Sequence, residues 1–546
     1  MRKLIGVSSN HRYRQEFYVD SANIQQLLPG APGGDDTGRG ILRETHISWV
    51  ILKGEYAYKI KKPVNFGFLN FSSLELRRHF CEEELRLNRR FSPELYLAVV
   101  PITRDEQGAR LEGSGPTIDY AVKMRRFDEK QLLDNIAVRG ELSHSLLRAL
   151  ARELAQLHSS LPTCHPDPAS GEPGTPAALH KAVEQNFQQI RNYPLPKAQL
   201  RRLEEVRQWS VQRYDELQPV LTQRVLDGWV IDGHGDAHLG NIALVDGTVR
   251  LFDCIEFNAS FRIMDSVAEI AFLTMDLDAR GYHHESHRLL TDYLEYRGDY
   301  AGLAPLDLYR SYFAMVRAKV SLLRESPQRT TITTADGYRE FLRYLQLAQR
   351  YIEPNQCFLA ITHGVSGTGK STIAGALVAA SGAVRIRSDV ERKRLAGLLP
   401  EQRSEPQDEA VLYGSAMSRK TFTRLEVLAE LAIKAGFPVI IDATFLHRHV
   451  RDSFHTLAHK LSVPFIIIDC LAQPGQLRQR LVERERQGQD ASEAGVAVME
   501  QQLGIDQALA GEELDYRLEA DSSEDVATLW QRFKKQCWPN EFGPTG

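Results

Sequence analysis

Residues 358–372 read FLAITHGVSGTGKST, a short apolar run followed by a glycine-rich turn. The apolar run predicts a buried strand, and the next segment, IAGALVAA, predicts a helix, so the turn joins a strand to a helix. Its spacing, G-x-x-x-x-G-K-[ST], is that of the phosphate-binding loop. Backbone N–H groups of such a loop cradle phosphates at the N-terminus of the helix that follows. A strand-to-helix turn that binds no ligand is the alternative interpretation.

The residues expected to hold ATP here form one continuous stretch. They are Gly364, Val365, Ser366, Gly367, Thr368, Gly369, Lys370, Ser371 and Thr372. We expect Lys370 to neutralise the β- and γ-phosphates and the Ser371 hydroxyl to ligate Mg²⁺.

Composition describes an ordinary globular protein. The 546 residues predict three or four folding units, with 42% hydrophobic and 25% charged residues. A net charge of −4 gives no reason to expect a broad nucleic-acid-binding surface, so nucleic acid is an unlikely partner on this ground. The six scattered cysteines include no C-x-x-C pair, which argues against a zinc site or a disulfide framework.

The location of the protein is inferred from its apolar segments. The start of the chain, MRKLIGVSSNHRYRQE, lacks the apolar core of a signal peptide. No apolar run approaches the roughly 20 residues that span a bilayer. We therefore expect a cytoplasmic protein without a membrane partner.

The chain before the glycine-rich turn divides into a strand-rich part and a helical part. Residues 1–39 predict a helix, at 14–28, and a loop. Residues 40–140 predict a lobe of strands with one helix, beginning with the hairpin HISWVIL and YAYKIKK. Residues 141–350 are dominated by helical patterns, starting at ELSHSLLRALARELAQLHSSL.

A second chemical motif lies inside the helical part. VIDGHGDAHLGNIAL places His234, Asp236 and Asn241 in the spacing H-x-D-x-x-x-x-N. Asp253 follows twelve residues after Asn241, at the end of an apolar strand. Two carboxylates and an amide near a strand pair can hold Mg²⁺ and orient a hydroxyl for in-line attack on a γ-phosphate.

The motifs HGDAHLGN and LFDCIEF resemble those of aminoglycoside phosphotransferases and choline kinases, which are small-molecule kinases with a two-lobe protein-kinase-like fold. The similarity spans roughly residues 40–340 and includes LAQLHSSL, which resembles the helix before the catalytic loop. By this resemblance Asp236 is the catalytic base, and Asn241 and Asp253 bind Mg²⁺. Asp265 resembles the acidic position after the metal-binding aspartate.

The resemblance also implies a nucleotide-binding ion pair. Lys59 would bind the α- and β-phosphates, anchored by Glu84 or Glu83, and Lys61 competes with Lys59 for this role. The chain departs from protein kinases because no G-x-G-x-x-G loop precedes the lysine and Cys254 replaces the phenylalanine of D-F-G. A nucleotide-binding pseudokinase is therefore an alternative.

Neighbouring polar residues have plainer interpretations. We expect His234 to brace the loop by hydrogen bonds and His238 to be a surface or packing histidine. Glu256 lies near the proposed metal site in sequence, but a carboxylate at a strand end fits equally well.

Strands alternate with helices after residue 356, which predicts a parallel sheet with helices on both faces. AVRIRSD ends at Asp389, GFPVIID ends at Asp442, and PFIIIDC is a third strand. Ligands of such sheets bind at the carboxyl ends of the strands. Asp442 therefore fits a magnesium position, and Asp389 is placed to accept a proton from a substrate hydroxyl. The alternative for each aspartate is a helix cap.

Arginines follow along the segment LRQRLVERERQGQDASEA. Arg480 and Arg484 could close over the phosphates as a lid, and a solvated helix face is the alternative. For Arg486 we prefer the solvated face.

The C-terminal half, roughly residues 356–520, resembles the P-loop kinases grouped near polynucleotide kinase, gluconate kinase and zeta-type toxins. The resemblance rests on RSD-x-x-R, DATF followed by Arg451, and R-x-x-x-R-x-x-x-G-x-D-x-S. It implies that Asp389 is the catalytic base, that Arg392 contacts substrate, and that Arg480 and Arg484 are lid residues. Residues 521–546 are left as a C-terminal tail.

The whole chain resembles fused bacterial proteins that join an aminoglycoside phosphotransferase domain to an ATP-binding kinase domain. The predicted architecture is an α+β two-lobe kinase-like domain followed by an α/β P-loop NTPase domain. The predicted function is ATP- and Mg²⁺-dependent phosphate transfer to a hydroxyl of a small molecule at two sites. The alternatives are one active P-loop kinase with a binding or regulatory N-terminal domain, and a kinase of nucleic-acid ends. The oligomeric state is left open.

Overall fold

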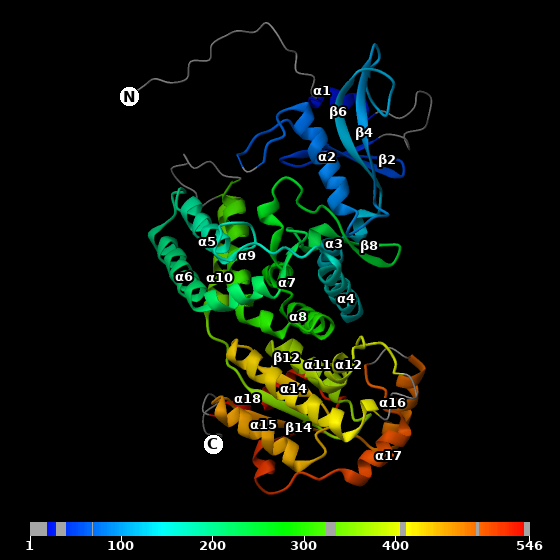
Figure 1. The fold of residues 1–546 in the computed structure, drawn as a ribbon, viewed down its shortest axis with the longest axis vertical. Helices are drawn as coiled ribbons and strands as arrows, with labels where there is room; N and C mark the ends of the chain where they lie inside the picture. The colour runs from blue at the N-terminus through cyan, green and yellow to red at the C-terminus, as the bar shows by residue number, and fades with distance from the viewer. Residues whose placement is uncertain are drawn as a thin grey trace. The chain divides into compact units, whose positions relative to one another are not determined.

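The computed structural model describes residues 19–28, 40–67, 69–323, 335–404, 411–487 and 491–539. The chain forms two compact units (Figure 1). The first unit consists of residues 1–132 and 241–262, and the second consists of residues 133–240 and 263–546. Among the described residues, no helix has both the length and the apolar character needed to cross a bilayer.

The first unit is built on a six-stranded antiparallel sheet with the order β1-β2-β3-β6-β4-β5. Its strands are β1 (Ile41–Glu44), β2 (Ser48–Lys53), β3 (Tyr56–Lys61), β4 (Tyr96–Asp105), β5 (Gly108–Leu111) and β6 (Thr117–Arg125). The predicted hairpin is confirmed, because β2 and β3 pair from Lys53 and Tyr56 outward. The helix α2 (Leu74–Asn88) and the hairpin of β8 (Ile242–Val245) and β9 (Thr248–Leu251) complete this lobe.

The helix α1 (Ser21–Leu27) belongs to the same lobe. The Asp20 side chain accepts a hydrogen bond from Asn23 N, which fixes the start of the helix at Ser21, and Ile24 and Leu27 join the apolar core of the sheet. The helix is therefore shorter than the predicted span of 14–28. The first part of that span and most of the predicted loop lie outside the described residues.

The helical part of the second unit agrees with the sequence pattern. It contains α3 (Leu133–Val138), α4 (His144–Ser160), α5 (Pro176–Ile190), α6 (Lys197–Leu226), α7 (Ser266–Ala279), α8 (His283–Arg297), α9 (Leu303–Leu323) and α10 (Asp336–Ile352). The short strands β7 (Val230–Asp232) and β10 (Ile263–Asp265) pair next to the predicted catalytic loop. Helix α7 is buried along almost its whole length, in keeping with a sequence that is predominantly apolar rather than apolar on one face only.

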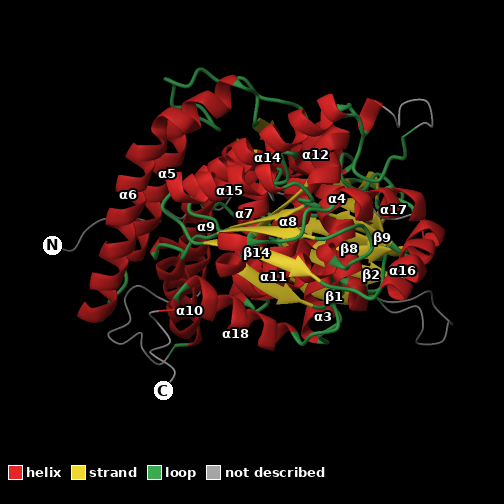
Figure 2. Cartoon of the chain, turned by 90° about the horizontal axis from the view of Figure 1, so that it is seen from below, coloured by secondary structure: helices red, strands yellow, loops and turns green. Residues whose placement is uncertain are grey.

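The P-loop domain has the predicted parallel sheet, in the order β12-β13-β11-β14-β15. The strands are β11 (Leu359–His363), β12 (Val384–Arg387), β13 (Val439–Asp442), β14 (Phe465–Cys470) and β15 (Arg517–Ala520). Its helices are α11 (Lys370–Ser381), α12 (Ser388–Leu395), α14 (Ser415–Lys434), α15 (Arg448–Lys460), α16 (Pro474–Gln487), α17 (Val496–Ile505) and α18 (Val526–Cys537). Figure 2 shows helices on either side of the yellow strands. One boundary differs from the prediction, because α12 begins at Ser388 and β12 therefore ends before Asp389.

The C-terminal residues are not simply a tail. Helix α18 buries Leu529, Phe533 and Cys537 in the same core cluster as Phe358 of the strand before the phosphate loop. The rings of Phe358 and Phe533 meet edge to face, with centroids 4.7 Å apart. The residues expected as a C-terminal tail from 521 onward therefore include a helix whose buried residues recur at four-residue spacing and belong to the core of the P-loop domain.

Phe533→Ala should destabilise the P-loop domain by about 3–5 kcal/mol, because it empties a fully buried aromatic site. Urea unfolding followed by tryptophan fluorescence measures the change, since Trp530 and Trp538 pack against the same cluster. Val526→Ala on the same helix is the control, because Val526 is exposed and should change stability by less than about 0.5 kcal/mol. Equal stability of the two variants would contradict the role of α18 in the core.

Candidate functional site

The phosphate loop lies between β11 and α11, where the sequence places it. Gly364, Gly367 and Gly369 all have positive φ angles, which L side chains rarely adopt. A Cβ atom at Gly369 would also lie 2.8 Å from Ser522 Cβ. The glycines are therefore required both by the backbone conformation and by close packing.

Lys370 folds back over this loop. Its Nζ donates hydrogen bonds to the carbonyl oxygens of Gly364, at 2.9 Å, and Val365, at 2.7 Å. These contacts hold the ammonium group on the concave side of the loop, close to the place where phosphates would bind.

A cavity of about 450 Å³ opens at the carboxyl ends of the strands. Its lining includes residues of the phosphate loop, among them Lys370 and Ser371, and four further residues that the sequence analysis singled out: Asp389, Arg392, Asp442 and Arg480. These residues come from separate segments that together span more than 100 positions, so the fold brings the predicted P-loop site together. Its volume is within the range of small-molecule pockets, roughly 300–1,000 Å³.

Asp442 ends β13 inside this cavity and is 5% exposed. Its Oδ2 receives no hydrogen bond from any described residue, and its nearest cationic partner is Arg387 Nε at 3.4 Å. A buried carboxylate oxygen without a hydrogen bond is costly unless a ligand satisfies it. With the Ser371 hydroxyl in the same cavity, the donor set is hard oxygen, which fits Mg²⁺.

Asp389 and Arg392 lie on α12. Asp389 is in the first turn, but Arg387 is the N-cap, so Asp389 does not have the simple capping role that was its alternative. Arg392 Nη1 donates to Leu412 O at 3.3 Å and to Ser418 Oγ at 3.2 Å. Its buried Nε has no hydrogen-bond partner among the described residues. This N–H could serve a ligand in the cavity.

Three of the four arginines of α16 were considered in the sequence analysis, and they have different surroundings. Arg480 Nη1 lies 3.5 Å from Gly367 O and 3.4 Å from Thr368 O, so it contacts the phosphate loop. Arg486 is exposed and pairs with Glu483 at 3.6 Å, in agreement with a solvated face. The side chain of Arg484 lies outside the described residues.

Sequence reasoning missed Gln502, on α17. Its Oε1 accepts a hydrogen bond from Ser366 N at 2.7 Å, so a side-chain amide occupies a loop N–H that phosphate oxygens use in such sites. Gln502 also lines the cavity. A lone glutamine on a helix carries no recognisable pattern in the sequence, so only its position in the fold identifies it.

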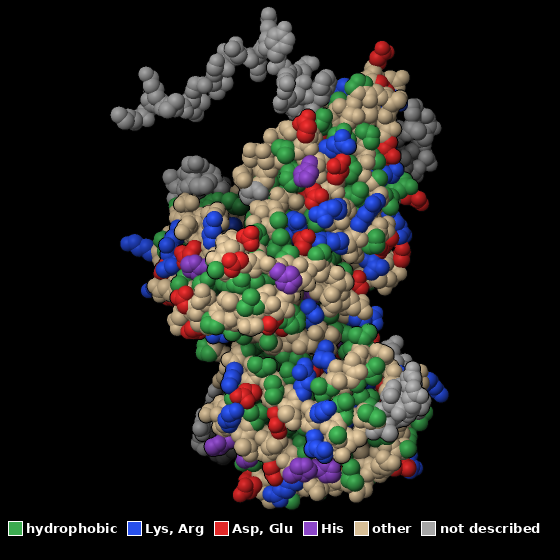
Figure 3. Space-filling view, in the orientation of Figure 1, with side chains coloured by type: hydrophobic (Ala, Val, Ile, Leu, Met, Phe, Trp, Pro, Cys, Tyr) green, Lys and Arg blue, Asp and Glu red, His purple; other side chains and the backbone are tan. Residues whose placement is uncertain are grey.

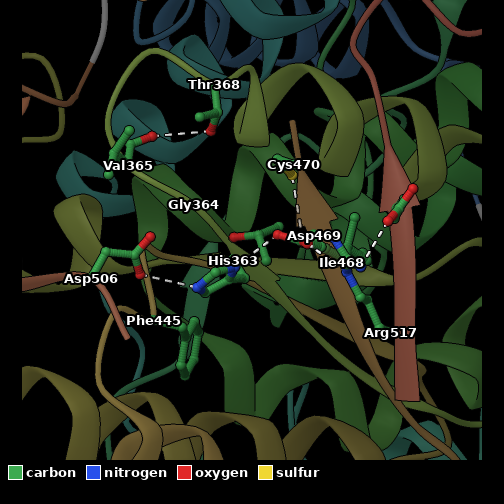
Figure 4. A network of polar contacts seen from close by, with 12 residues as sticks. His363, Gly364, Val365, Thr368, Phe445, Ile468, Asp469, Cys470, Asp506 and Arg517 are labelled. Atoms are coloured by element: carbon green, nitrogen blue, oxygen red, sulfur yellow. Dashed lines mark hydrogen bonds and ion pairs between the residues drawn. The ribbon is translucent and has the colours of Figure 1, made fainter. Parts of the chain in front are cut away.

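His363, directly before the first loop glycine, was also missed. Its Nδ1 lies 2.8 Å from Asp469 Oδ1, and its Nε2 lies 3.2 Å from Asp506 Oδ1 (Figure 4). Arg517 donates to Asp469 Oδ2 at 2.7 Å. Burial raises the pKa of Asp469, but the hydrogen bonds from His363 and Arg517 outweigh it and hold this pKa below its usual value. This network ties β11, β14 and β15 to the residue after α17.

The second predicted site is partly assembled within the first unit. Lys59 Nζ donates to Glu84 Oε1 at 2.9 Å and also pairs with Asp253. Lys61 Nζ donates to Glu84 Oε2 at 2.7 Å and pairs with Glu256. Glu84 therefore anchors both lysines.

These contacts differ between the residues that the sequence left as alternatives. The competing carboxylate, Glu83, pairs instead with Arg86 at 2.7 Å on the helix surface. Only Lys59 reaches Asp253, among the described contacts of the two lysines, so it fits the nucleotide-binding role better than Lys61. Glu256 is an ion-pair partner of the buried Lys61 rather than an isolated strand-end carboxylate.

The electrostatics of this cluster are strongly coupled. Burial raises the pKa of Glu84, but Lys59 and Lys61 outweigh it and lower this pKa to about 2. Asp253 has a φ of 63°, an uncommon backbone conformation, and its N–H donates to the Tyr96 hydroxyl at 3.0 Å. The remaining predicted magnesium ligand, Asn241, is 8% exposed in the same unit.

The predicted base, Asp236, lies in the second unit. Its backbone N–H donates to His234 Nδ1 at 3.3 Å, which agrees with the bracing role expected of His234. His238 Nε2 is 3.5 Å from Asp236 Oδ2, so the expectation of a mere surface or packing histidine was incomplete. Burial raises the pKa of Asp236, but the His238 charge and hydrogen bond outweigh it, so the carboxyl pKa is lowered and the group is ionised at neutral pH.

Glu269 of α7 holds this loop by hydrogen bonds, and the sequence analysis did not identify it. Its Oε1 accepts hydrogen bonds from the backbone N–H groups of His234 and Gly235, and its Oε2 from His158 at 3.0 Å. A Cβ at Gly233 would lie 2.5 Å from Glu269 Oε1, so glycine is required there. Asp265 is structural, because it forms a buried ion pair with Arg224.

Comparison with known proteins places the chain in a family. A family model for an AAA domain, AAA_33, matches residues 359–505 and confirms the predicted P-loop domain. Uncharacterized protein Rv2004c of Mycobacterium tuberculosis (strain ATCC 25618 / H37Rv) is 30% identical over 457 residues, which cover 83% of this chain and 87% of that protein. The chain belongs to the same family.

Solved structures also align with it. Amicoumacin kinase hAmiN, solved with AMP-PNP, Ca²⁺ and Ami, is 13% identical, has a TM-score of 0.38, and covers 61% of this chain and 94% of its own. A gluconokinase from Sinorhizobium meliloti 1021 is 17% identical, has a TM-score of 0.24, and covers 35% of this chain and 99% of its own.

Two structural features of the chain concern the binding of phosphate groups. A phosphate loop lies in the matched AAA domain, and a kinase-type lysine–glutamate pair lies in the first unit. Both features are of the kind used in phosphate transfer from ATP, in which such a loop binds the phosphates and such a lysine–glutamate pair orients them.

Glu84→Gln should remove much of the acid sensitivity of the first unit. The folded-state pKa of Glu84 is depressed, so its stabilisation is present above its usual pKa of 4.5 and is lost as the pH falls toward about 2. Urea unfolding between neutral pH and pH 2 should show a flatter pH dependence in the variant. Glu82→Gln, at an exposed surface pair, is the control and should follow the wild type. Parallel curves for wild type and Glu84→Gln would contradict the assignment.

Gln502→Ala should strengthen nucleotide binding about two- to tenfold, because phosphate no longer has to displace the amide from Ser366 N. Gln502→Glu should weaken it, since a carboxylate would repel phosphate from the loop. Titration with a fluorescent ATP analogue measures both effects. Unchanged affinity in both variants would show that Gln502 does not compete with the ligand.

Proposed function

We propose that each module transfers the γ-phosphate of ATP, with Mg²⁺, to a hydroxyl group of a small molecule. The observation that carries the proposal is the cavity in which Lys370, Ser371, Asp389 and Asp442 converge. Among the described charged residues that line it, four are basic and two are acidic, which suits an anionic ligand such as a triphosphate.

The residues of this cavity would have different roles in phosphate transfer. The loop N–H groups and Lys370 would bind and orient the phosphates, and Arg480 would stabilise negative charge that develops during transfer. Asp389 would accept the proton of the attacking hydroxyl, and Arg392 would orient the acceptor. Ser371 and Asp442 would hold Mg²⁺, whose charge neutralises phosphate oxygens.

The other module supplies the same functions from different residues. Lys59, held by Glu84, would bind the α- and β-phosphates, and Asn241 and Asp253 would hold Mg²⁺. Asp236 would act as base, with its carboxylate kept ionised by His238. The formed Lys59–Glu84 pair supports an active site rather than a pseudokinase, because this pair marks the competent arrangement of the fold.

Nucleic acid is the less favoured acceptor. On the face shown in Figure 3, basic and acidic side chains are interspersed rather than gathered into a basic tract. A kinase of nucleic-acid ends would need a positively charged groove with stacked aromatic side chains. Transfer of labelled phosphate from ATP to a 5′-hydroxyl oligonucleotide would support this alternative.

Asp236→Ala and Lys370→Ala should each remove a different part of the phosphotransfer activity. We expect losses of at least about 100-fold at the affected site, because one substitution removes a general base and the other a phosphate-binding cation. The measurement is transfer from labelled ATP, with Mg²⁺, to a panel of hydroxyl compounds. If only Lys370→Ala reduces turnover, the N-terminal module is a binding or regulatory domain. If neither substitution reduces it, the proposal is wrong.

A further inference from the structure

Helix α8, which belongs to the kinase-like helical part, lies directly against the P-loop domain within the second unit. Residues at four-residue spacing form the contact face. His287 Nδ1 lies 2.9 Å from Ala379 O at the end of α11, and Thr291 Oγ1 lies 3.5 Å from Ala383 O. Glu295 Oε1 accepts a hydrogen bond from Arg385 Nε, in β12, at 2.8 Å.

The other side of α8 is fixed in the helical part. Ser286 Oγ donates to Thr274 O at 3.2 Å, and the Tyr293 hydroxyl lies 2.9 Å from His158 Nδ1. His158 in turn contacts Glu269, which holds the loop that carries Asp236. Helix α8 therefore packs within the kinase-like helical part on one side and against the P-loop domain on the other.

The contact contains buried charges. The side chains of Arg385, Glu295 and Asp292 are 7%, 2% and 2% exposed. Arg385 Nη2 lies 2.7 Å from Glu295 Oε1 and 3.6 Å from Asp292 Oδ1. Removing one partner of such a pair leaves the other charge buried without compensation, so β12 depends on carboxylates that another module supplies.

Arginines that contact Glu295 also contact or flank residues of the P-loop site. Arg385 Nη1 lies 3.4 Å from the carbonyl oxygen of Ser371, the residue expected to hold Mg²⁺. Arg394, on α12, donates from Nη2 to the backbone carbonyl of Glu295 at 2.5 Å. Residues 385–394 carry Asp389 and Arg392, so Glu295 contacts both ends of the segment that bears the proposed base and the proposed acceptor contact.

We propose that Glu295 is a positioning residue for phosphotransfer at the P-loop site, acting from the kinase-like module: its carboxylate holds Arg385, and its backbone carbonyl holds Arg394. This inference rests on the proposed function of that site. Glu295 touches no substrate in this role. It fixes the distance between the phosphate loop, at Ser371, and the start of α12, at Asp389, which must remain constant for in-line transfer.

The test uses the full-length protein with Asp236→Ala in every variant, so that only the P-loop site contributes turnover. Glu295→Gln should lower Lys370-dependent turnover at least about tenfold while the dissociation constant of a fluorescent ATP analogue changes less than about threefold. Glu295→Asp, which keeps the charge, should recover part of the turnover. Glu285→Gln is the control, because it lies on the same helix outside the contact with Arg385 and Arg394 and should behave as the parent.

A second variant covers the case in which Glu295→Gln fails to fold. Arg394→Met removes the other link, while Glu391 keeps Arg424 at 2.6 Å as its partner. It should lower turnover in the same way, with nucleotide affinity retained. Turnover equal to the control in a folded Glu295→Gln, or in Arg394→Met, overturns the positioning role. If Lys370→Ala leaves turnover unchanged, the proposed function fails first and the positioning role fails with it.

Discussion

A charged side chain that leaves water must find a partner of opposite charge, and this constraint organises both modules. In the first unit Glu84 sits between Lys59 and Lys61, which in turn hold Asp253 and Glu256. Without these partners, each buried ion would cost several kcal/mol. The sheet, helix α2 and the segment after β9 are consequently fixed relative to one another by charge pairs as well as by apolar packing.

The same constraint acts differently where chemistry is expected. Arg224 is fully compensated by Asp265 and Asp299, so that cluster is structural. Asp442 Oδ2 and Arg392 Nε, in contrast, are buried in the P-loop site without a hydrogen bond from the described residues. Incomplete satisfaction in a polar cavity leaves capacity for a cation and an anion. The structural cluster around Arg224 therefore has its charged groups paired, whereas the candidate site keeps buried polar atoms without a hydrogen bond from the described residues.

Helix α8 connects the kinase-like helical part to the P-loop domain by direct side-chain contacts. Its carboxylates neutralise an arginine of the P-loop sheet, and its opposite side supports the loop that bears Asp236 through His158 and Glu269. Packed elements of this kind have few alternative arrangements, because protein interiors are dense. The kinase-like helical part is thus a structural component of the P-loop domain as well as a neighbour in sequence.

The sequence by itself determined the phosphate loop, the parallel sheet and the hairpin of Lys59, because these depend on local spacing and periodicity. It also placed Asp442 at the end of a strand, as the structure does, whereas Asp389 lies in the first turn of α12. Only the tertiary structure chose Glu84 over Glu83, placed α18 in the core, and revealed Gln502, Glu269 and Glu295. The physical reason is that each of these depends on a partner far along the chain, and a single sequence carries no signal for which distant residues will meet.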